Sequence, residues 1–461
     1  MTSPALGPTA LLGQSVAEIV TGPIAPEVLE KAAMCLLDAL GLGVIARHER
    51  TTLAMRDIAT ALPAGAPGAR LWAYGTRCSL TEAVAANAVA VHGHFHDDSD
   101  PHSWCHPGSL IIPVAVGLAE TTHASLPTML RAIAAGYSTL NWLGAREHVA
   151  HALIKRGVRT SPALGTIGAA ATASVMLGLP AAQATHAVAI ATTITGGMLE
   201  PLGCGSDEWR VQNAQAARGG LLAAQLAARE VVGARTALEG KKGLLAALAG
   251  LTEVPPGWRE PMRPDGILNI YAKPWATLGD NMAAVRAAKL LHDDGIRCTD
   301  IESIRVHLWR AYTEYPGTQY KGPFDHPIQA LASTAFATAA MLLRGDLEFD
   351  VALEQRQNPE ILALVKRIEI VPSDAGTKLD SRIELRMNDG RVIVRDAADA
   401  PRNWLYHDPE TASRIFERRL VSQGHATGTG AALATRIFAA ISEPGDSPLG
   451  AVLDTLGRQP G

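Results

Sequence analysis

The segment Val254-Pro255-Pro256-Gly257 divides this chain of 461 residues into two parts with different sequence patterns. Before it, from Pro26 to about Gly250, Ala and Leu recur at three- and four-residue spacing, and segments end at Gly or Pro, which is typical of helices. Ala-rich stretches such as Ala216–Arg229 allow helix axes to approach closely. We therefore predict a large helical bundle in the first part of the chain.

After the Pro-rich break the pattern changes to that of strands. Ile301–Leu308 partly alternates between apolar and polar residues. Arg382–Met387 and Arg391–Val394 are joined by Asn388-Asp389-Gly390, which predicts a β-hairpin. Between these strands, Ile328–Leu343 has the pattern of one buried helix.

These patterns predict a mostly α fold with a smaller α+β domain. The tail, Asp408–Ser442, returns to a helical pattern and is expected to rejoin the first part. We predict a helical domain at 1–265 that is completed by 399–461, and an α+β domain at 266–398. A chain of this length is expected to form more than one core.

The composition excludes several classes of protein. The chain has 41 Lys and Arg against 45 Asp and Glu, a net charge of −4, and no basic stripe, which argues against nucleic-acid binding. No apolar run reaches membrane-spanning length, and the first twenty residues have no cationic start before an apolar core, so we expect no membrane segment. The five cysteines are odd in number and lack CxxC spacing, which excludes a zinc ribbon and favours the cytoplasm.

One short segment concentrates residues that move protons or bind metals. His92, His94 and His96 precede Asp97-Asp98-Ser99, and His106-Pro107-Gly108 follows shortly after. Imidazole and carboxylate groups are the common acids, bases and metal ligands near neutral pH. This histidine segment is therefore the first candidate for an active site.

A metal-dependent hydrolase using His94, His96 and Asp98 is one alternative, because His94 to Asp98 begins an H-x-H-x-D pattern. That pattern ends in His, where this chain has Ser99, and it follows a strand, whereas Thr81–Val91 is predicted to be a helix. We therefore predict no metal. Cys105 and Cys204 lack an evident base for thiol chemistry. The glycine-rich Gly424–Gly430 lacks the spacing of a nucleotide loop and is predicted to link two tail helices.

Many short motifs, in order, resemble those of the MmgE/PrpD family, which contains 2-methylcitrate dehydratases, cis-aconitate decarboxylases and iminodisuccinate epimerases. The motifs are Asp38-Ala-Leu-Gly41, Asp97-Asp98-Ser99, His106-Pro107-Gly108, Gly165-Thr-Ile-Gly168, Gly196-Gly-Met-Leu-Glu200, Ala216-Ala217-Arg218, Leu238-Glu239-Gly240 and Lys273-Pro274. The resemblance implies a helical domain with an α+β lid, a homodimer, and cofactor-free proton transfer next to a carboxylate of a small di- or tricarboxylate.

The resemblance also implies roles for individual residues. His106 matches the catalytic histidine and Lys273 the lysine that opens the lid motif. Asp97 would orient His106 or act as a partner base. Asp98 matches the second acid of the pair, and Ser99 stands where Thr is usual. The alternatives are helix capping for His106 and Asp98, and a solvated surface position for Lys273.

Other positions depart from the family pattern. The family's first loop aspartate falls on Phe95, or on His94 or His96 with a shift of one residue. Arg159 replaces a histidine, and Trp209 and Gln212, with Arg210 alongside, replace a lysine and a histidine. Phe336 replaces a tyrosine, and Asn281 a histidine. We expect substrate contacts from Arg159, Arg210, Ser99, Asp98, Trp209 and His96, with surface ion pairs as the alternative for the two arginines.

The best prediction from these residues is a cofactor-independent lyase, a dehydratase or decarboxylase, that acts on a small carboxylate between the two domains. An epimerase of the same family is the first alternative. Because several titratable groups of the family are replaced, a catalytically inactive binding protein is another.

Overall fold

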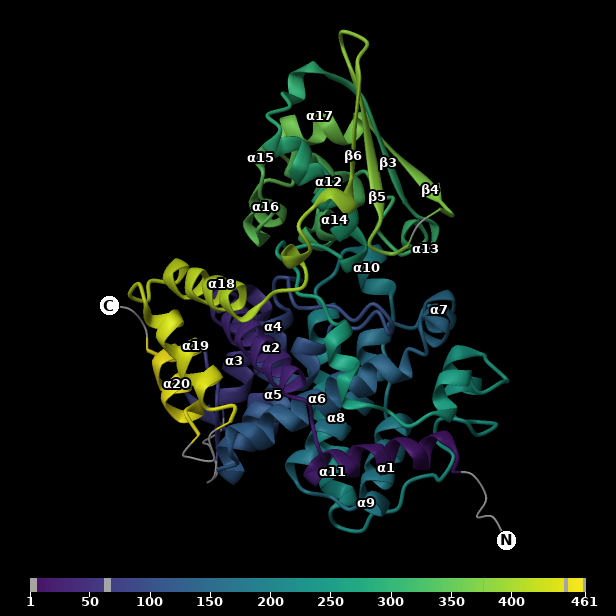
Figure 1. The fold of residues 1–461 in the computed structure, drawn as a ribbon, viewed down its shortest axis with the longest axis vertical. Helices are drawn as coiled ribbons and strands as arrows, with labels where there is room; N and C mark the ends of the chain where they lie inside the picture. The colour runs from purple at the N-terminus through teal and green to yellow at the C-terminus, as the bar shows by residue number, and fades with distance from the viewer. Residues whose placement is uncertain (1–5, 62–67, 376, 443–446, 459–461) are drawn as a thin grey trace.

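The computed structural model describes residues 6–61, 68–375, 377–442 and 447–458. The chain forms a helical part and a smaller part built around a four-stranded sheet, which lies at the top of Figure 1. The prediction of a mostly α fold with a smaller α+β part is confirmed. No helix in these described ranges is both long and apolar enough to span a membrane.

The helical part takes most of its helices from the first half of the chain. They are α1 (Pro8–Thr21), α2 (Pro26–Ile45), α3 (Arg50–Thr60), α4 (Leu80–His92), α5 (Pro107–Thr122), α6 (Leu126–Leu143), α7 (His148–Lys155), α8 (Thr160–Met176), α9 (Ala181–Thr193), α10 (Glu200–Cys204) and α11 (Trp209–Ala227). A short ribbon of β1 (Ala69–Arg70) and β2 (Arg77–Cys78) precedes α4. The α-helices of the first part end at Ala227, because Gly233, Gly240 and Gly243 interrupt the following segment. A π-helix at Leu245–Ala249 follows before Gly250.

Small residues hold the helices of this part close together. A Cβ atom on Gly136 of α6 would lie 2.0 Å from Thr172 Oγ1 of α8. A Cβ on Gly220 of α11 would lie 2.4 Å from the Cβ of Ala169, also on α8. The central helix α8 is buried along its whole length, so its first turn is fixed firmly beside the histidine segment.

The sheet has the order β4-β3-β5-β6, with β3 (Ile301–Trp309), β4 (Ile368–Ser373), β5 (Ser381–Met387) and β6 (Val392–Asp396). The predicted hairpin is confirmed, since β5 and β6 pair antiparallel across Asn388-Asp389-Gly390. The helices of this part are α12 (Met282–Asp293), α13 (Arg310–Thr313), α14 (Pro327–Ala332), α15 (Thr334–Arg344), α16 (Phe349–Glu354) and α17 (Pro359–Arg367). Of these, α12 and α15 pack against the sheet.

Two features of this part differ from the prediction. The segment predicted as one helix at Ile328–Leu343 is two helices, because Ser333 is extended and its Oγ accepts a hydrogen bond from the backbone N–H of Phe336 at 3.0 Å, capping α15. The strand β4 and the helix α17 before it were not predicted. Strand β4 runs parallel to β3 at the sheet edge, where its Pro372 is tolerated.

The tail adds α18 (Pro409–Ser422), α19 (Thr429–Ala439) and α20 (Leu449–Leu456). The first part of the predicted linker, up to Gly428, joins α18 to α19, whereas Thr429 and Gly430 already belong to α19. Phe416 and Leu433 of the tail pack in the apolar core of the helical part. Phe95 and Trp209 belong instead to the core of the sheet-bearing part, so the histidine segment lies where the two cores meet. The boundaries 1–265, 266–398 and 399–461 themselves stay a prediction.

Candidate active site

A narrow pocket with His106 in its wall lies where the two parts meet. Its lining residues are Ser99, Asp100, Pro101, Trp104 and His106 from the helical part, and Tyr271, Leu278, Gly279, Asp280, Tyr312 and Tyr315 from the lid side. The two sides are joined by backbone hydrogen bonds, from the N–H of Ser99 to the carbonyl of Tyr271 at 2.9 Å and from the N–H of Tyr271 to the carbonyl of Ser99 at 3.1 Å. The pocket is therefore built from two segments far apart in the sequence.

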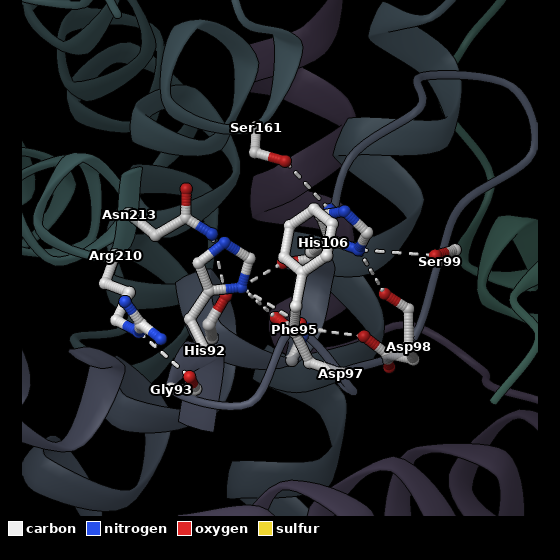
Figure 2. Close-up of polar contacts among 12 residues, drawn as sticks. His92, Gly93, Phe95, Asp97, Asp98, Ser99, His106, Ser161, Arg210 and Asn213 are labelled. Carbon is white, nitrogen blue, oxygen red and sulfur yellow. Dashed lines mark hydrogen bonds and ion pairs between the residues drawn. The ribbon is translucent and has the colours of Figure 1, made fainter. Parts of the chain in front are cut away.

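His106 directly precedes Pro107, the first residue of α5, and its ring is held by backbone and hydroxyl groups. Its Nδ1 lies 3.0 Å from the carbonyl oxygen of Asp98 and 3.3 Å from Ser99 Oγ, as Figure 2 shows. A carbonyl oxygen can only accept, so Nδ1 carries the proton and Nε2 keeps its lone pair. Burial and the nearby charge of Lys273 hold the pKa of His106 well below its usual value. His106 is thus a neutral imidazole with a basic nitrogen.

The Asp98 carboxylate fixes the segment to two helices. It accepts hydrogen bonds from the backbone N–H of Gly108 in α5 at 2.7 Å and from the hydroxyl of Tyr137 in α6 at 2.8 Å. Burial, assisted by the charge of Asp38, raises the pKa of Asp98 to about 7. The contact with the first turn of α5 resembles the capping alternative, and the side chain of Asp98 does not line the His106 pocket.

Asp97 holds a different histidine from the one we expected. Both of its carboxylate oxygens lie 2.9 Å from Nδ1 of His92, and Arg159 Nη2 lies 2.7 Å from Nε2 of the same ring. Burial, with three nearby cations, lowers the pKa of His92, so this ring is neutral. The ring donates to Asp97 and accepts from Arg159. His106 is oriented by the Asp98 carbonyl instead of by Asp97.

The two arginines expected to bind carboxylates are occupied by protein groups. Arg159 also donates to the carbonyl of Trp209 at 2.6 Å and to Gln212 Oε1 at 3.3 Å. Arg210 donates to the carbonyl of Gly93 at 2.9 Å and to Asp207 at 2.9 Å, and its guanidinium lies 4.1 Å from the ring centroid of Trp209. Both arginines are 2% exposed, so the alternative of surface ion pairs is wrong, and neither lines the His106 pocket.

Lys273 is fully buried, so the surface alternative is wrong here too. Its Nζ donates to the carbonyl of Phe95 at 2.6 Å and to the carbonyl of Thr277 at 3.0 Å, and lies 4.7 Å from the ring centroid of Phe95. The backbone of Phe95 adopts a positive φ of 54°, a left-handed conformation that changes the direction of the chain at this residue. Burial lowers the pKa of Lys273 to about 8, although nearby carboxylates oppose the shift. The lysine places a positive charge beside the histidine segment.

The residues of the metal alternative do not converge. His94 stacks on Phe349 with ring centroids 4.2 Å apart, and His96 Nδ1 lies 3.7 Å from Glu348, while Asp98 binds Gly108 and Tyr137. In the described part of the chain, no three His, Cys, Asp or Glu side chains are grouped as metal ligands. Burial also raises the pKa of the Cys105 thiol, which opposes thiolate chemistry.

Several pocket residues were missed by sequence reasoning. Phe336, which matches a family tyrosine, packs on Phe324 in the lid core at 5.1 Å between ring centroids. Tyr312 and Tyr315, which lie within six residues of the end of strand β3, line the pocket instead. Residues that follow the end of a strand are a signal that a sequence can offer. Asn281 hydrogen-bonds Thr277 Oγ1 at 2.9 Å, whereas its neighbour Asp280 lines the pocket.

Comparison with known proteins agrees with this architecture. The chain is 26% identical over 447 residues to a cis-aconitate decarboxylase-like protein, oryM, of Aspergillus oryzae, covering 89% of each chain. It is 25% identical over 374 residues to human cis-aconitate decarboxylase, covering 76% of this chain and 73% of the relative. The mouse cis-aconitate decarboxylase is 24% identical over 386 residues, with 80% and 77% covered.

Family models match both parts of the chain. Residues 11–256 match the MmgE/PrpD N-terminal domain, and residues 281–417 match the MmgE/PrpD C-terminal domain. The first match spans the helical part and the second spans the sheet. The chain therefore belongs to the MmgE/PrpD family, as its motifs predicted.

Proposed function

We propose that the protein is a cofactor-independent lyase, a dehydratase or decarboxylase, that transfers a proton next to a carboxylate of a small acid. The observation that carries the proposal is the state of His106, whose Nδ1–H is held by a backbone carbonyl while Nε2 stays free of hydrogen bonds to the described residues. A buried neutral imidazole in a pocket is suited to accept a proton from carbon. Two relatives are named cis-aconitate decarboxylases, and decarboxylation also includes a proton transfer at a carbon next to a carboxylate, in the direction of the carbon.

For dehydration, His106 removes the proton from the carbon next to the carboxylate, negative charge develops on that carboxylate, and the hydroxyl group leaves as water. For decarboxylation, carbon dioxide leaves first, the same negative charge develops, and the carbon then takes up a proton. Lys273 supplies the positive charge that stabilises this negative charge, because its charge already acts on His106. Tyr315 is the proposed proton donor to the departing group or to the product carbon. Burial raises the pKa of Tyr315, so its hydroxyl stays protonated across the working pH range. Ser99 keeps His106 in place through its hydroxyl.

The remaining predicted site residues take positioning roles in the proposal. Asp97, Arg159 and His92 form one buried chain of hydrogen bonds behind the pocket. Trp209 packs on His92 with ring centroids 4.8 Å apart, and Arg210 fixes the end of α4 through Gly93. His96 and Asp98 lie outside the lining of the His106 pocket. These groups hold the histidine segment and do not touch substrate.

The test uses metal-free protein in D2O with a panel of small di- and tricarboxylates, followed by mass spectrometry and proton NMR. We expect loss of water or carbon dioxide from one class of acid, abolished in His106→Ala and kept in His148→Ala, an exposed histidine at the start of α7. Activity that needs added zinc would instead support the metal hydrolase. Silence with every acid, with and without zinc, would support the inactive binding protein.

An epimerase is the second candidate, because the pocket has acid and base groups on both walls. His106 comes from the helical side, and Asp280 and Tyr315 come from the lid side. Inversion at carbon needs a proton removed from one face and returned to the other. The same incubation separates the candidates, since an epimerase adds deuterium to its substrate without loss of water or carbon dioxide.

The homodimer, the cytoplasmic location and the domain boundaries are proposed on the family resemblance, the cysteine content and the sequence pattern. Light scattering during size exclusion tests the first, and we expect a mass twice that of one chain.

A further inference from the structure

Asp280 is a buried carboxylate whose role the proposed reaction leaves open. It lies in the short helical turn Gly279–Asn281, directly before α12, and its residue is 8% exposed. Its Oδ1 has no hydrogen-bond partner within the described residues, and the residue lines the His106 pocket. Burial raises the pKa of Asp280 to about 7, because a buried carboxylate oxygen without a partner is costly. A cationic ligand that donates to this oxygen would favour its charged form, so the unpartnered carboxylate in the pocket points to such a ligand.

The backbone around Asp280 is pressed against the loop that carries Ser99. A Cβ atom on Gly279 would lie 2.7 Å from the hydroxyl oxygen of Tyr271 and 3.1 Å from Ser99 Oγ. A side chain at this position would force Tyr271 or Ser99 to shift, so glycine allows the close approach that brings the next residue, Asp280, into the pocket wall. The nearby cation Lys273 directs two of its hydrogen bonds to the carbonyls of Phe95 and Thr277, and forms no ion pair with Asp280.

The charges of the lining residues favour a ligand with a positively charged group over a ligand with additional carboxylates. The described pocket lining contains two aspartates and neither lysine nor arginine. Asp100 is already satisfied by Ser103 Oγ at 2.6 Å, Asn141 at 2.9 Å and the backbone N–H of His102 at 2.9 Å. Asp280 is therefore the lining carboxylate with an unused oxygen.

Aromatic rings complete the wall beside this carboxylate. Trp104 packs edge-on to Tyr312 with centroids 5.3 Å apart and lies 5.9 Å from the ring of Tyr315. A carboxylate combined with aromatic rings is a common binding site for an ammonium group, because the ring faces carry negative electrostatic potential. The tyrosine hydroxyls remain as donors for a substrate carboxylate.

We propose that Asp280 binds a protonated amino group of the substrate, so that the acid processed here is an amino-substituted carboxylate. The inference rests on the proposed function of the His106 pocket. It predicts that unsaturated tricarboxylates without an amino group, the acids of the decarboxylase relatives, fit this pocket poorly.

Two matched sets of acids test the proposal by titration calorimetry. One is aspartate, malate and succinate, and the other is glutamate, 2-hydroxyglutarate and glutarate, with both enantiomers where they exist. Within a set the acids differ in one substituent, which is ammonium, hydroxyl or hydrogen. We expect the amino acid of at least one set to bind about ten-fold or more tightly than its two partners, as for a hydrogen bond to a charged group.

Asp280→Asn should abolish this preference while leaving the binding of the unsubstituted acid unchanged or stronger. The matched control is Asp293→Asn, an exposed carboxylate at the far end of α12, which should keep the wild-type ranking. If Asp280→Asn does not fold, as judged by circular dichroism, the wild-type ranking alone decides. Equal binding of the amino and hydroxy acids, tightest binding of the unsubstituted acid, or no binding of any probe overturns the proposal.

The outcome separates this proposal from the proposed function. His106→Asn should abolish deuterium exchange and keep the preference for the amino acid, because the two residues act on different atoms. Exchange that persists without any amino preference overturns the role of Asp280 alone. An amino preference without exchange overturns the proton-transfer function alone.

Discussion

His92 and His106 are two buried histidines whose ring centroids lie 5.4 Å apart, yet their hydrogen bonds differ. Both nitrogens of His92 are occupied, by Asp97 and by Arg159. His106 uses Nδ1 alone, and its residue lines a pocket. Burial lowers the pKa of both rings, so the pKa direction does not distinguish them. The comparison teaches that an unused nitrogen, not a perturbed pKa, separates the candidate base from the structural histidine.

Substitution of each histidine tests whether His106 is the catalytic base and His92 is structural. His106→Asn should lower kcat by about 10²- to 10⁴-fold, because no other described group in the pocket matches its neutral nitrogen base. His92→Asn should lower the free energy of unfolding and leave kcat less affected, because His92 has no nitrogen free for substrate. Deuterium exchange rates and urea titrations measure the two effects. A larger loss of kcat in His92→Asn than in His106→Asn would reverse the assignment.

Lys273 provides the second test, since its charge acts on His106 without direct contact in the pocket. Lys273→Met should lower kcat by about 10²-fold, because the developing negative charge loses its cation. The wild-type kcat/KM should fall as the pH rises through about 8, where Lys273 loses its proton. His106 should cause no decline at lower pH, because its lowered pKa keeps it unprotonated there. For an amino-substituted acid, kcat/KM should instead decline as the pH falls through about 7, where Asp280 gains a proton.

The control for this pH dependence is the variant itself. In Lys273→Met the decline above pH 8 should be absent, although the rate is lower throughout. A decline that persists in the variant would assign it to another group and remove Lys273 from the proposed chemistry.

Asp97 tests the structural role of His92, because Asp97 accepts a hydrogen bond from that ring, whose other nitrogen is bound by Arg159. Asp97→Asn keeps a hydrogen-bond acceptor for His92 and removes a negative charge that acts on Arg159 across the His92 ring. Leaving a buried arginine without its counter-charge should lower the free energy of unfolding by about 3 kcal/mol. We expect kcat to stay within about ten-fold of wild type, as for a positioning residue.

Asp265→Asn is the matched control for this loss of stability, since Asp265 pairs with Arg263 on the surface and its side chain is 44% exposed. Its effect on unfolding should be below about 1 kcal/mol. Equal effects of the two substitutions in urea titrations would show that the Asp97 carboxylate does not stabilise the buried arginine.

Local signals in the sequence were sufficient for part of the fold and part of the site. The hairpin of β5 and β6 depends on the local turn Asn388-Asp389-Gly390, so the sequence pattern was enough to predict it. Strand β4 depends on parallel pairing with distant β3, and Pro372 weakens its local signal. In the pocket, His106 and Ser99 follow from family motifs. Asp280 could not be predicted, because its place depends on contact between distant segments.

The arginines illustrate the same limit. Arg159 and Arg210 stand where the family has titratable groups, and their residue type favours carboxylate binding. Their partners in the fold are nevertheless the carbonyls of Trp209 and Gly93, together with His92 and Asp207. Which partner satisfies a buried cation is decided by packing, which no sequence spacing reports.

Asp98 gives the smallest expected effect on turnover and tests which part of the residue orients His106. Its backbone carbonyl, not its carboxylate, receives the Nδ1–H of His106. Asp98→Asn keeps that carbonyl, so kcat should stay within a few-fold of wild type. A loss of kcat as large as that of His106→Asn would mean that the carboxylate takes part in the chemistry.

The same variant should change how stability depends on pH. Folding raises the pKa of Asp98 from its ordinary 3.8 to about 7, so between these values the folded protein holds a proton that the unfolded chain has released. Its contribution to the free energy of unfolding therefore decreases as the pH rises from about 4 to about 7, by at most about 1.4 kcal/mol per pH unit. In Asp98→Asn that contribution is absent, so the variant should gain stability relative to wild type as the pH rises. Urea titrations at pH 5 and pH 7 measure the difference, and a constant gap between the two proteins would contradict a raised pKa. If Asp98→Asn retains turnover and changes the pH dependence of the free energy of unfolding, the imidazole of His106 performs the reaction, and the Asp98 carboxylate affects only the stability of the fold.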